Sequence, residues 1–236
     1  MKLLGKLYLI PTTMGESDPM DVLPQTVKRS IDFIDHYIVE NEKTARKSIK
    51  AVSPEKKQSE LILFTLNKRT EPSEHLDFIK PLLEGKNVGL MSEAGCPGVA
   101  DPGAVIVKLA HEKGIQVVPL VGPSSILLAM MASGMNGQSF TFNGYLPIDK
   151  DEKKSAIRHF EKLSHDKNQS QLFIETPYRN NQLFETMLKH LNPATKVCVA
   201  VDLTGKNESV VTRSVKDWQN NIPQLHKRPA IFLLLA

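Results

Sequence analysis

The amino-acid sequence predicts an α/β protein with two domains, the first built on a mainly parallel sheet and the second on a mixed sheet. Short apolar runs alternate with helical patterns through the first half, which is typical of parallel strands joined by crossover helices. From Phe140 onwards the pattern changes to alternating, hairpin-like strands, which indicates antiparallel pairing. A glycine- and proline-rich stretch, residues 92–103, follows an apolar strand and precedes a helix, as ligand loops do in open α/β sheets.

The first half supplies strands and helices in regular alternation. Pro11 closes the first strand, and Gly85 and Gly114 each follow the end of a helix. The predicted strands cover residues 7–10, 37–39, 61–65, 88–91 and 115–118. The predicted helices start near Pro24, cover residues 44–51, 72–83 and 104–113, and begin again at Gly122.

The second half is more varied. A half-exposed strand at 140–142 and a turn at 144–147 are followed by a charged amphipathic helix over 149–163 and a polar linker loop over 164–170. The next predicted elements are a strand at 172–174, a helix at 178–191 and a strand at 197–201. Two β-like stretches, 209–212 and 230–235, flank a helix near 215–220 and predict a hairpin-like antiparallel tail. We place the domain boundary so that the domains are 1–119 and 120–236.

The composition is that of a globular protein. Of 236 residues, 41% are hydrophobic and 24% are charged, which allows a sizeable core. The formal net charge of +4 permits a polyanionic partner without requiring one. Two cysteines are too few for a disulfide framework. No apolar run reaches the ~18 residues of a membrane span, and the opening residues read as a strand, so we expect a cytoplasmic protein with no membrane partner.

Several motifs that would define other chemistries are absent from the sequence. It has no GxxxxGK[ST] phosphate loop, no GxGxxG after a strand, no GxSxG, no HExxH and no CxxC. The seven histidines are scattered, so no metal site is predicted. Cys96 lies in the glycine-rich loop but has no paired histidine in the sequence, which argues against a nucleophile.

The remaining candidate residues lie in loops that follow the predicted strands. These loops are 11–15, 40–43, 92–101, 122–125 and 175–179. In a parallel sheet they lie at one edge, where such folds bind ligands. Their glycines, hydroxyls and acids suit a neutral or cationic ligand better than a polyphosphate. The plainer alternatives are helix capping for Ser124 and Ser125 and solvated loop acids for Glu93 and Asp101.

Five blocks of sequence, in order, resemble those of the tetrapyrrole-methylase-like, class III S-adenosylmethionine methyltransferases. SEAGCPGVADPG, residues 92–103, is similar to that family's S-D-A-G-T-P-G-I-S-D-P-G loop. The other similar blocks are residues 7–12, 118–125, 140–147 and 175–179. The branch with the greatest similarity methylates a ribose 2′-hydroxyl of small-subunit (16S) ribosomal RNA.

The resemblance implies the tetrapyrrole methylase fold, in which two α/β domains hold the donor S-adenosyl-L-methionine in a cleft between them, usually as a homodimer. It also implies ribosomal RNA or the small ribosomal subunit as partner, and no metal. By motif position, the donor-binding residues would be Ile10, Glu93, Gly95, Cys96, Pro97, Ser124, Ser125, Val201, Leu203, Pro229 and Ala230.

Methyl transfer to a ribose hydroxyl requires in-line positioning and removal of the hydroxyl proton. The candidate bases are Glu40, Glu42, Glu93 and Asp101, and Lys43 is the candidate cation. The sequence departs from the family pattern at 41–43 and 228–230. Two alternatives therefore stay open: a methyltransferase for a tetrapyrrole or other small acceptor, and a non-catalytic paralogue that binds RNA or a nucleotide.

Overall fold

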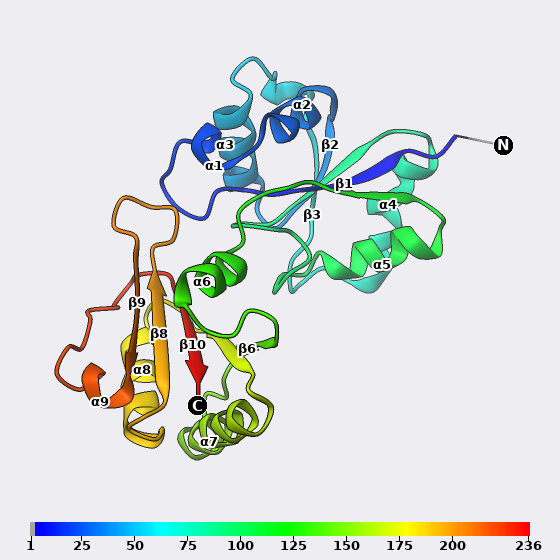
Figure 1. Ribbon diagram of the computed structural model, residues 1–236. Helices are drawn as coiled ribbons and strands as arrows, with labels where there is room; N and C mark the ends of the chain where they lie inside the picture. The colour runs from blue at the N-terminus through cyan, green and yellow to red at the C-terminus, as the bar shows by residue number, and fades with distance from the viewer. Residues whose placement is uncertain (1–2) are drawn as a thin grey trace. The chain divides into compact units, whose positions relative to one another are not determined.

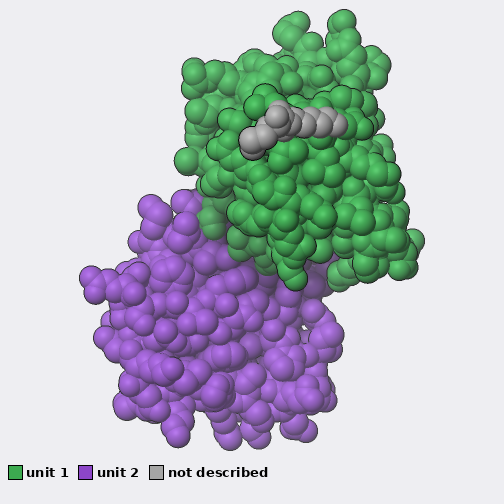
Figure 2. All heavy atoms as spheres, turned by 90° about the vertical axis from the view of Figure 1, so that its right-hand side faces the viewer, with its two compact units in different colours: residues 1–124 green, residues 125–236 purple. Residues whose placement is uncertain are grey.

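The computed structural model describes residues 3–236, which form two compact units, coloured separately in Figure 2. The first unit ends at Ser124 and the second runs from Ser125 to Ala236. The boundary expected after residue 119 lies at the end of a strand, a few residues before this division. Within residues 3–236, no helix is long and apolar enough to cross a membrane.

The first unit is built on a wholly parallel sheet with strand order β3-β2-β4-β1-β5 (Figure 1). Every adjacent pair of strands is parallel, which confirms the predicted topology. The strands are β1 (Lys6–Ile10), β2 (His36–Val39), β3 (Ile62–Thr65), β4 (Val88–Met91) and β5 (Gln116–Pro119). β4, which leads into the glycine-rich loop, lies in the centre of the sheet and is buried along its length.

Helices cover both faces of this sheet, because successive strand residues point to opposite sides. In β2, Tyr37 belongs to the core cluster with Ile31, whereas Ile38 belongs to the other cluster with Ile79. One face carries α1 (Pro19–Val22), α2 (Gln25–Phe33) and α3 (Glu42–Val52), and the other carries α4 (His75–Leu83) and α5 (Ala104–Glu112) (Figure 1). Two short 3₁₀ helices, η1 (Gln58–Glu60) and η2 (Pro72–Glu74), lie in the connections.

The second unit contains the predicted mixed sheet, with strand order β6-β7-β10-β8-β9. β6 is parallel to β7, and the other adjacent pairs are antiparallel. The strands are β6 (Phe140–Tyr145), β7 (Ser170–Ile174), β8 (Lys196–Val201), β9 (Ser209–Ser214) and β10 (Ala230–Leu235). The helices are α6 (Ser125–Ser133), α7 (Lys150–Lys167), α8 (Asn180–His190) and α9 (Val215–Trp218).

The core of the second unit lies between the sheet and helices α7, α8 and α9. Phe173 and Phe232 of the sheet pack there against Phe184 and Trp218. α6 is tied to the sheet by the Thr212 hydroxyl, which donates to the Ser133 carbonyl oxygen at 2.7 Å.

The predicted hairpin-like, antiparallel tail is wrong: β9 and β10 do not pair with each other, and both run antiparallel to β8, which lies between them. β9 pairs with β8, and β10 lies between β7 and β8 in the middle of the sheet. The sequence of β10, AIFLLL, is apolar at every position and is buried from Ala230 to Leu234. A continuous apolar run of this kind is typical of a strand that is covered on both faces of its sheet.

The polar loop predicted over residues 164–170 is also wrong in large part. α7 continues to Lys167, and β7 begins at Ser170. Ser164 is fully buried, and its hydroxyl oxygen accepts the Ala236 backbone N–H at 2.9 Å. Asn168 ends the helix in the left-handed conformation, with φ of 47°. The polar composition of this stretch concealed the end of the helix, because the residue that the helix buries there, Ser164, is itself polar.

Candidate functional site

The candidate residues of the first unit lie at the carboxyl edge of its sheet. Because β1, β2 and β4 are adjacent and parallel, the segments that follow them start at the same edge. The structure therefore places the residues after Ile10, Val39 and Met91 next to one another, as the sequence predicts.

The loop after β4 is held against the loop after β1 by backbone hydrogen bonds. Thr12 and Gly95 form an isolated antiparallel bridge, with N–H···O distances of 3.0 and 3.3 Å. The buried Thr12 hydroxyl also donates to the Ser92 carbonyl oxygen at 3.3 Å. These contacts fix the path of a loop whose glycines would otherwise leave it free.

Two glycines allow a third segment to approach these loops. Gly95 has φ of +73°, and a Cβ there would lie 3.3 Å from the Pro123 carbonyl oxygen. At Gly122, a Cβ would lie 2.2 Å from Pro11 Cβ, which no side chain can occupy. Larger residues at these two positions would therefore push the segments apart.

Cys96 is a neutral thiol in this arrangement. Its Sγ donates to the Pro123 carbonyl oxygen at 3.3 Å, and burial raises its pKa. A thiol with a raised pKa is a poor nucleophile, because the thiolate is the reactive form. Cys96 therefore serves to hold the loop, and the structure agrees with the argument against a nucleophile.

Asp101 organises the turn that ends the glycine-rich loop. Its two carboxylate oxygens accept the Gly98 backbone N–H at 2.9 and 2.8 Å, and one of them also accepts the Gly103 N–H at 2.7 Å. Burial raises the pKa of Asp101, and the hydrogen bonds from Gly103 and Gly98 oppose that rise. Both oxygens are occupied by the loop itself, which favours a structural role over proton transfer.

Glu40 differs from Asp101 in having one engaged oxygen. Its Oε1 accepts the Glu93 backbone N–H at 3.2 Å, and the side chain is half-buried. Burial raises its pKa, and the nearby charges of Asp101 and Glu93 raise it further. Glu93 is exposed, and its Oε1 accepts the Thr44 hydroxyl at 2.5 Å. Of the predicted bases, Glu40 combines a raised pKa with a single engaged oxygen, which favours it as the proton acceptor.

The departures from the family pattern after β2 leave the local fold intact. Asn41 caps α3 by accepting the backbone N–H groups of Lys43 and Thr44 at 2.9 and 3.3 Å. Lys43 and Glu42 are exposed in the first turn of that helix. Among residues 3–236, the Lys43 side chain has no ion pair, so its charge is available to a partner.

The second unit brings its own candidates together. Val201 and Ala230 are paired across β8 and β10, and the Asp202 backbone N–H donates to the Pro229 carbonyl oxygen at 3.0 Å. Leu203 follows and is buried. The other candidate in this unit, Ser125, begins α6.

Asp202 and Asn180, which the sequence did not single out, hold the segment around Arg228 and Pro229 in place. Arg228 Nε donates to Asp202 Oδ2 at 2.8 Å, and Nη2 lies at an ion-pair distance of 2.8 Å from the same oxygen. The Asn180 side chain donates to the Arg228 carbonyl oxygen at 2.6 Å. Asn180 is fully buried, and its Oδ1 has no hydrogen-bond partner in the part of the chain that the structure describes. Asp202 and Asn180 carry no sequence signal, since they lie far apart along the chain.

The first-unit loops suit a positively charged sulfonium. Residues 11–15, 92–103 and 122–125 contain no lysine or arginine, while the half-buried carboxyl groups of Glu40 and Asp101 lie at the same edge. The positive φ of Gly95 also exposes backbone where a side chain would stand. Over residues 3–236, no group of three or more His, Cys, Asp or Glu side chains forms a possible metal site.

Comparisons with known proteins agree with this geometry. The sequence model for the family described as Tetrapyrrole (Corrin/Porphyrin) Methylases matches residues 8–218. The chain is 30% identical over 220 residues to Ribosomal RNA small subunit methyltransferase I of Bacillus subtilis, covering 92% of this chain and 71% of that protein.

Solved structures show the same fold. The methyltransferase CobJ aligns over 98% of this chain and 94% of its own, with a TM-score of 0.65 at 16% identity. Uroporphyrin-III C-methyltransferase from Thermus thermophilus, solved with S-adenosylhomocysteine, covers 98% and 97% with a TM-score of 0.59 at 16% identity.

Proposed function

The chain belongs to the tetrapyrrole (corrin/porphyrin) methylase family, and we propose that it is a methyltransferase that uses S-adenosylmethionine and acts on small-subunit ribosomal RNA. The observation that carries this proposal is the 30% identity, over 92% of the chain, with a protein named for that activity. The carboxyl edge of the first unit's sheet carries acidic side chains and tight glycine turns, and this supports the choice of a positively charged sulfonium donor.

We propose the ribose 2′-hydroxyl as the acceptor. Its oxygen attacks the methyl carbon, the carbon–sulfur bond breaks, and the bonding electron pair returns to sulfur, so the sulfonium becomes a neutral thioether. The hydroxyl proton passes to a base. In-line positioning of the two reactants supplies up to roughly 7–11 kcal/mol of the barrier reduction.

Glu40 is the base that the structure favours. One of its oxygens holds the Glu93 backbone N–H, and its pKa is raised by burial, then by the neighbouring charges. Asp101 would shape the loop instead, since both of its oxygens accept N–H groups. Lys43, exposed at the start of α3, would contact a phosphate of the acceptor.

The donor contacts that we propose follow from the position of each residue in the family motifs. In the first unit these are Ile10, Glu93, Gly95, Cys96, Pro97 and Ser124. In the second unit they are Ser125, Val201, Leu203, Pro229 and Ala230. We also propose that the protein acts as a homodimer in the cytoplasm, where its ribosomal substrate would be found, and sedimentation equilibrium tests the dimer.

Isothermal titration with S-adenosylmethionine and then S-adenosylhomocysteine tests the donor site. We expect wild-type binding to be lost in Gly95→Arg and kept in Gly137→Arg, because Gly137 lies outside the candidate loops, is exposed, and a Cβ there meets nothing within 4 Å. Both variants add the same side chain. Wild-type affinity weaker than about 1 mM, in a folded protein, would refute the proposal.

Transfer of a labelled methyl group to isolated small-subunit ribosomal RNA tests the acceptor. Transfer to a tetrapyrrole instead would change the acceptor class. Donor binding without transfer to either acceptor would point to a non-catalytic relative. Digestion of the labelled RNA to nucleosides would show whether the methyl group is on the ribose.

A further inference from the structure

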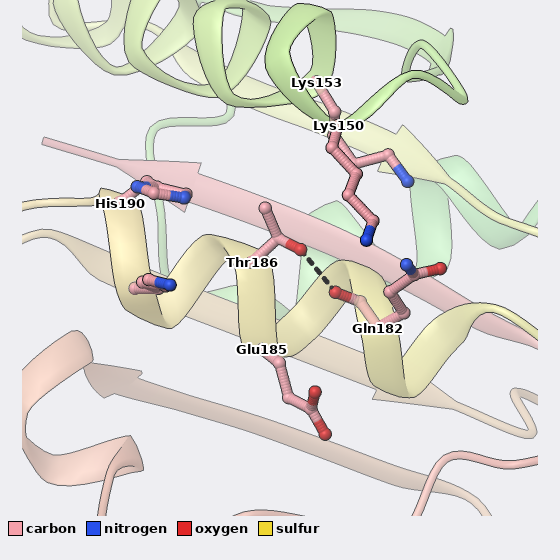
Figure 3. A pocket seen from close by; sticks show the side chains of 7 residues that line it. Lys150, Lys153, Gln182, Glu185, Thr186 and His190 are labelled. Atoms are coloured by element: carbon pink, nitrogen blue, oxygen red, sulfur yellow. Dashed lines mark hydrogen bonds between the residues drawn. The ribbon is translucent and has the colours of Figure 1, made fainter.

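A basic pocket lies in the second unit between the start of α7 and one face of α8, and nothing in the proposed chemistry uses it. Its volume is about 250 Å³. Lys150 and Lys153 contribute from α7, and Lys189 and His190 from the end of α8. Figure 3 shows Lys150 and Lys153 extending from α7 toward α8.

Lys153 is the unusual member of this group. Only 4% of the residue is exposed, yet within residues 3–236 its ammonium group has no hydrogen bond or ion pair. The stem is therefore buried, while the ammonium group keeps contact with water, as long cationic side chains commonly do. Because the side chain lines the pocket, a counter-ion bound there would lie beside this charge.

The surroundings do not supply that counter-ion. Glu185 is the one acid that lines the pocket, and Figure 3 shows its carboxylate on the opposite side of α8 from the two α7 lysines. Asp149, which precedes α7, accepts the backbone N–H groups of Asp151 and Glu152 at 2.9 and 3.0 Å. Its carboxylate is therefore directed to the helix terminus.

The potential inside the pocket is positive. The pKa of His190 is lowered, first by burial and then by the charges of Lys154, Arg158 and Lys189. The imidazole is therefore neutral near pH 7 and can donate one N–H. Thr186, whose hydroxyl is bonded to the Gln182 backbone carbonyl at 2.6 Å, and the Gln182 amide add neutral polar groups.

We propose that this pocket binds a backbone phosphate of the RNA substrate, away from the nucleotide that is methylated. Lysine ammonium groups bind phosphate as point charges, and neutral N–H donors complete the oxygen contacts. The choice of a phosphodiester rests on the proposed function, in which the partner is ribosomal RNA. One phosphate contact carries no sequence information and contributes affinity and register.

The test is the salt dependence of binding to isolated small-subunit ribosomal RNA, measured by fluorescence anisotropy between about 50 and 200 mM salt. Lys153→Met keeps the length of the buried stem and removes the charge. We expect weaker binding and a slope of log K against log salt that is shallower by about 0.7–0.9, the value for one lost phosphate contact.

Lys162→Met is the matched control. Lys162 lies on the same helix and is exposed, and its nine-residue separation from Lys153 places it roughly 180° around the helix axis. It removes the same charge from the chain without reaching the pocket, so we expect the wild-type slope. Lys189→Met, at an exposed pocket position, should reproduce part of the Lys153→Met effect without disturbing buried packing.

The two proposals fail in different ways. If wild-type protein binds the RNA but Lys153→Met and Lys162→Met share its slope, the phosphate pocket is wrong and the proposed function stands. If wild-type protein does not bind the RNA at all, the proposed function fails first. Donor affinity by titration should be the same in all variants, and a loss in Lys153→Met would mean that its effect is structural.

Discussion

Replacing Gly122 by alanine tests whether the segments at the carboxyl edge of the first sheet form one packed group. A Cβ at Gly122 would lie 2.2 and 2.3 Å from Cβ and Cγ of Pro11, against the 3.5–4.0 Å of ordinary carbon contacts. The segments must separate by more than about 1 Å to accept the methyl group. Overpacking of this kind costs about 1–3 kcal/mol.

Hydrogen exchange followed by mass spectrometry measures this loss locally. A cost of about 1–3 kcal/mol corresponds to roughly 5- to 160-fold faster exchange of amide protons in β1 and β5. Peptides from β8 and β10 in the second unit serve as an internal reference. We expect donor affinity to fall by about tenfold or more, since 1.4 kcal/mol of strain in the binding loops corresponds to that factor.

The control is Gly15→Ala in the neighbouring loop. Gly15 is exposed, and an added Cβ meets nothing within 4 Å, so its effect should stay within about 0.5 kcal/mol. If Gly122→Ala exchanges and binds donor like wild type, or if Gly15→Ala is equally damaged, the close approach to Pro11 does not hold the site together.

Three further predictions concern single side chains. Glu40→Gln should lower the methyl-transfer rate by about 10²–10⁴-fold while the affinity for the donor is kept. Because the pKa of Glu40 is raised, the activity of the wild-type protein should fall in acid at a pH above the ordinary carboxyl range. The variant should also be more stable than wild type at neutral pH but not in acid, as thermal unfolding at two pH values would show. Cys96 should react slowly with iodoacetamide at pH 7, since burial raises its pKa, and rapid alkylation would contradict this. Arg228→Met should cost about 1 kcal/mol, because the pair with Asp202 is partly exposed, and an unchanged unfolding midpoint by Trp218 fluorescence would count against it.

Much of the fold could be predicted because local patterns agreed with the packing. The strand that ends at Met91 is central and fully buried. Its apolar sequence and the glycine-rich stretch after it predicted a buried strand that leads into a loop. The position of β10 between β7 and β8 could not be predicted, because local sequence patterns do not specify which earlier strands a later strand will pair with. The end of α7 was missed because the buried residue near its terminus, Ser164, is polar.

The candidate site was predictable in its location and less so in its roles. Parallel topology alone brings the ends of β1, β2 and β4 together. What distinguishes Glu40 from Asp101 is which N–H groups each carboxylate accepts, and those groups come from turns with positive φ at Gly95 and Gly98. The importance of Asp202 and Asn180 depends on contacts with Arg228, which lies 26 and 48 residues away.

The interior place of β10 imposes an order on biosynthesis. The first unit has all its strands by Pro119, so it can fold while the rest of the chain is still being made. The second sheet stays in two halves, β6-β7 and β8-β9, until β10 arrives to join them. Between the completion of β8 at Val201 and that of β10 at Leu235, translation takes roughly 2–7 s. During that interval two strand edges are open to pairing with other chains, which makes this the period when the nascent protein depends most on chaperones.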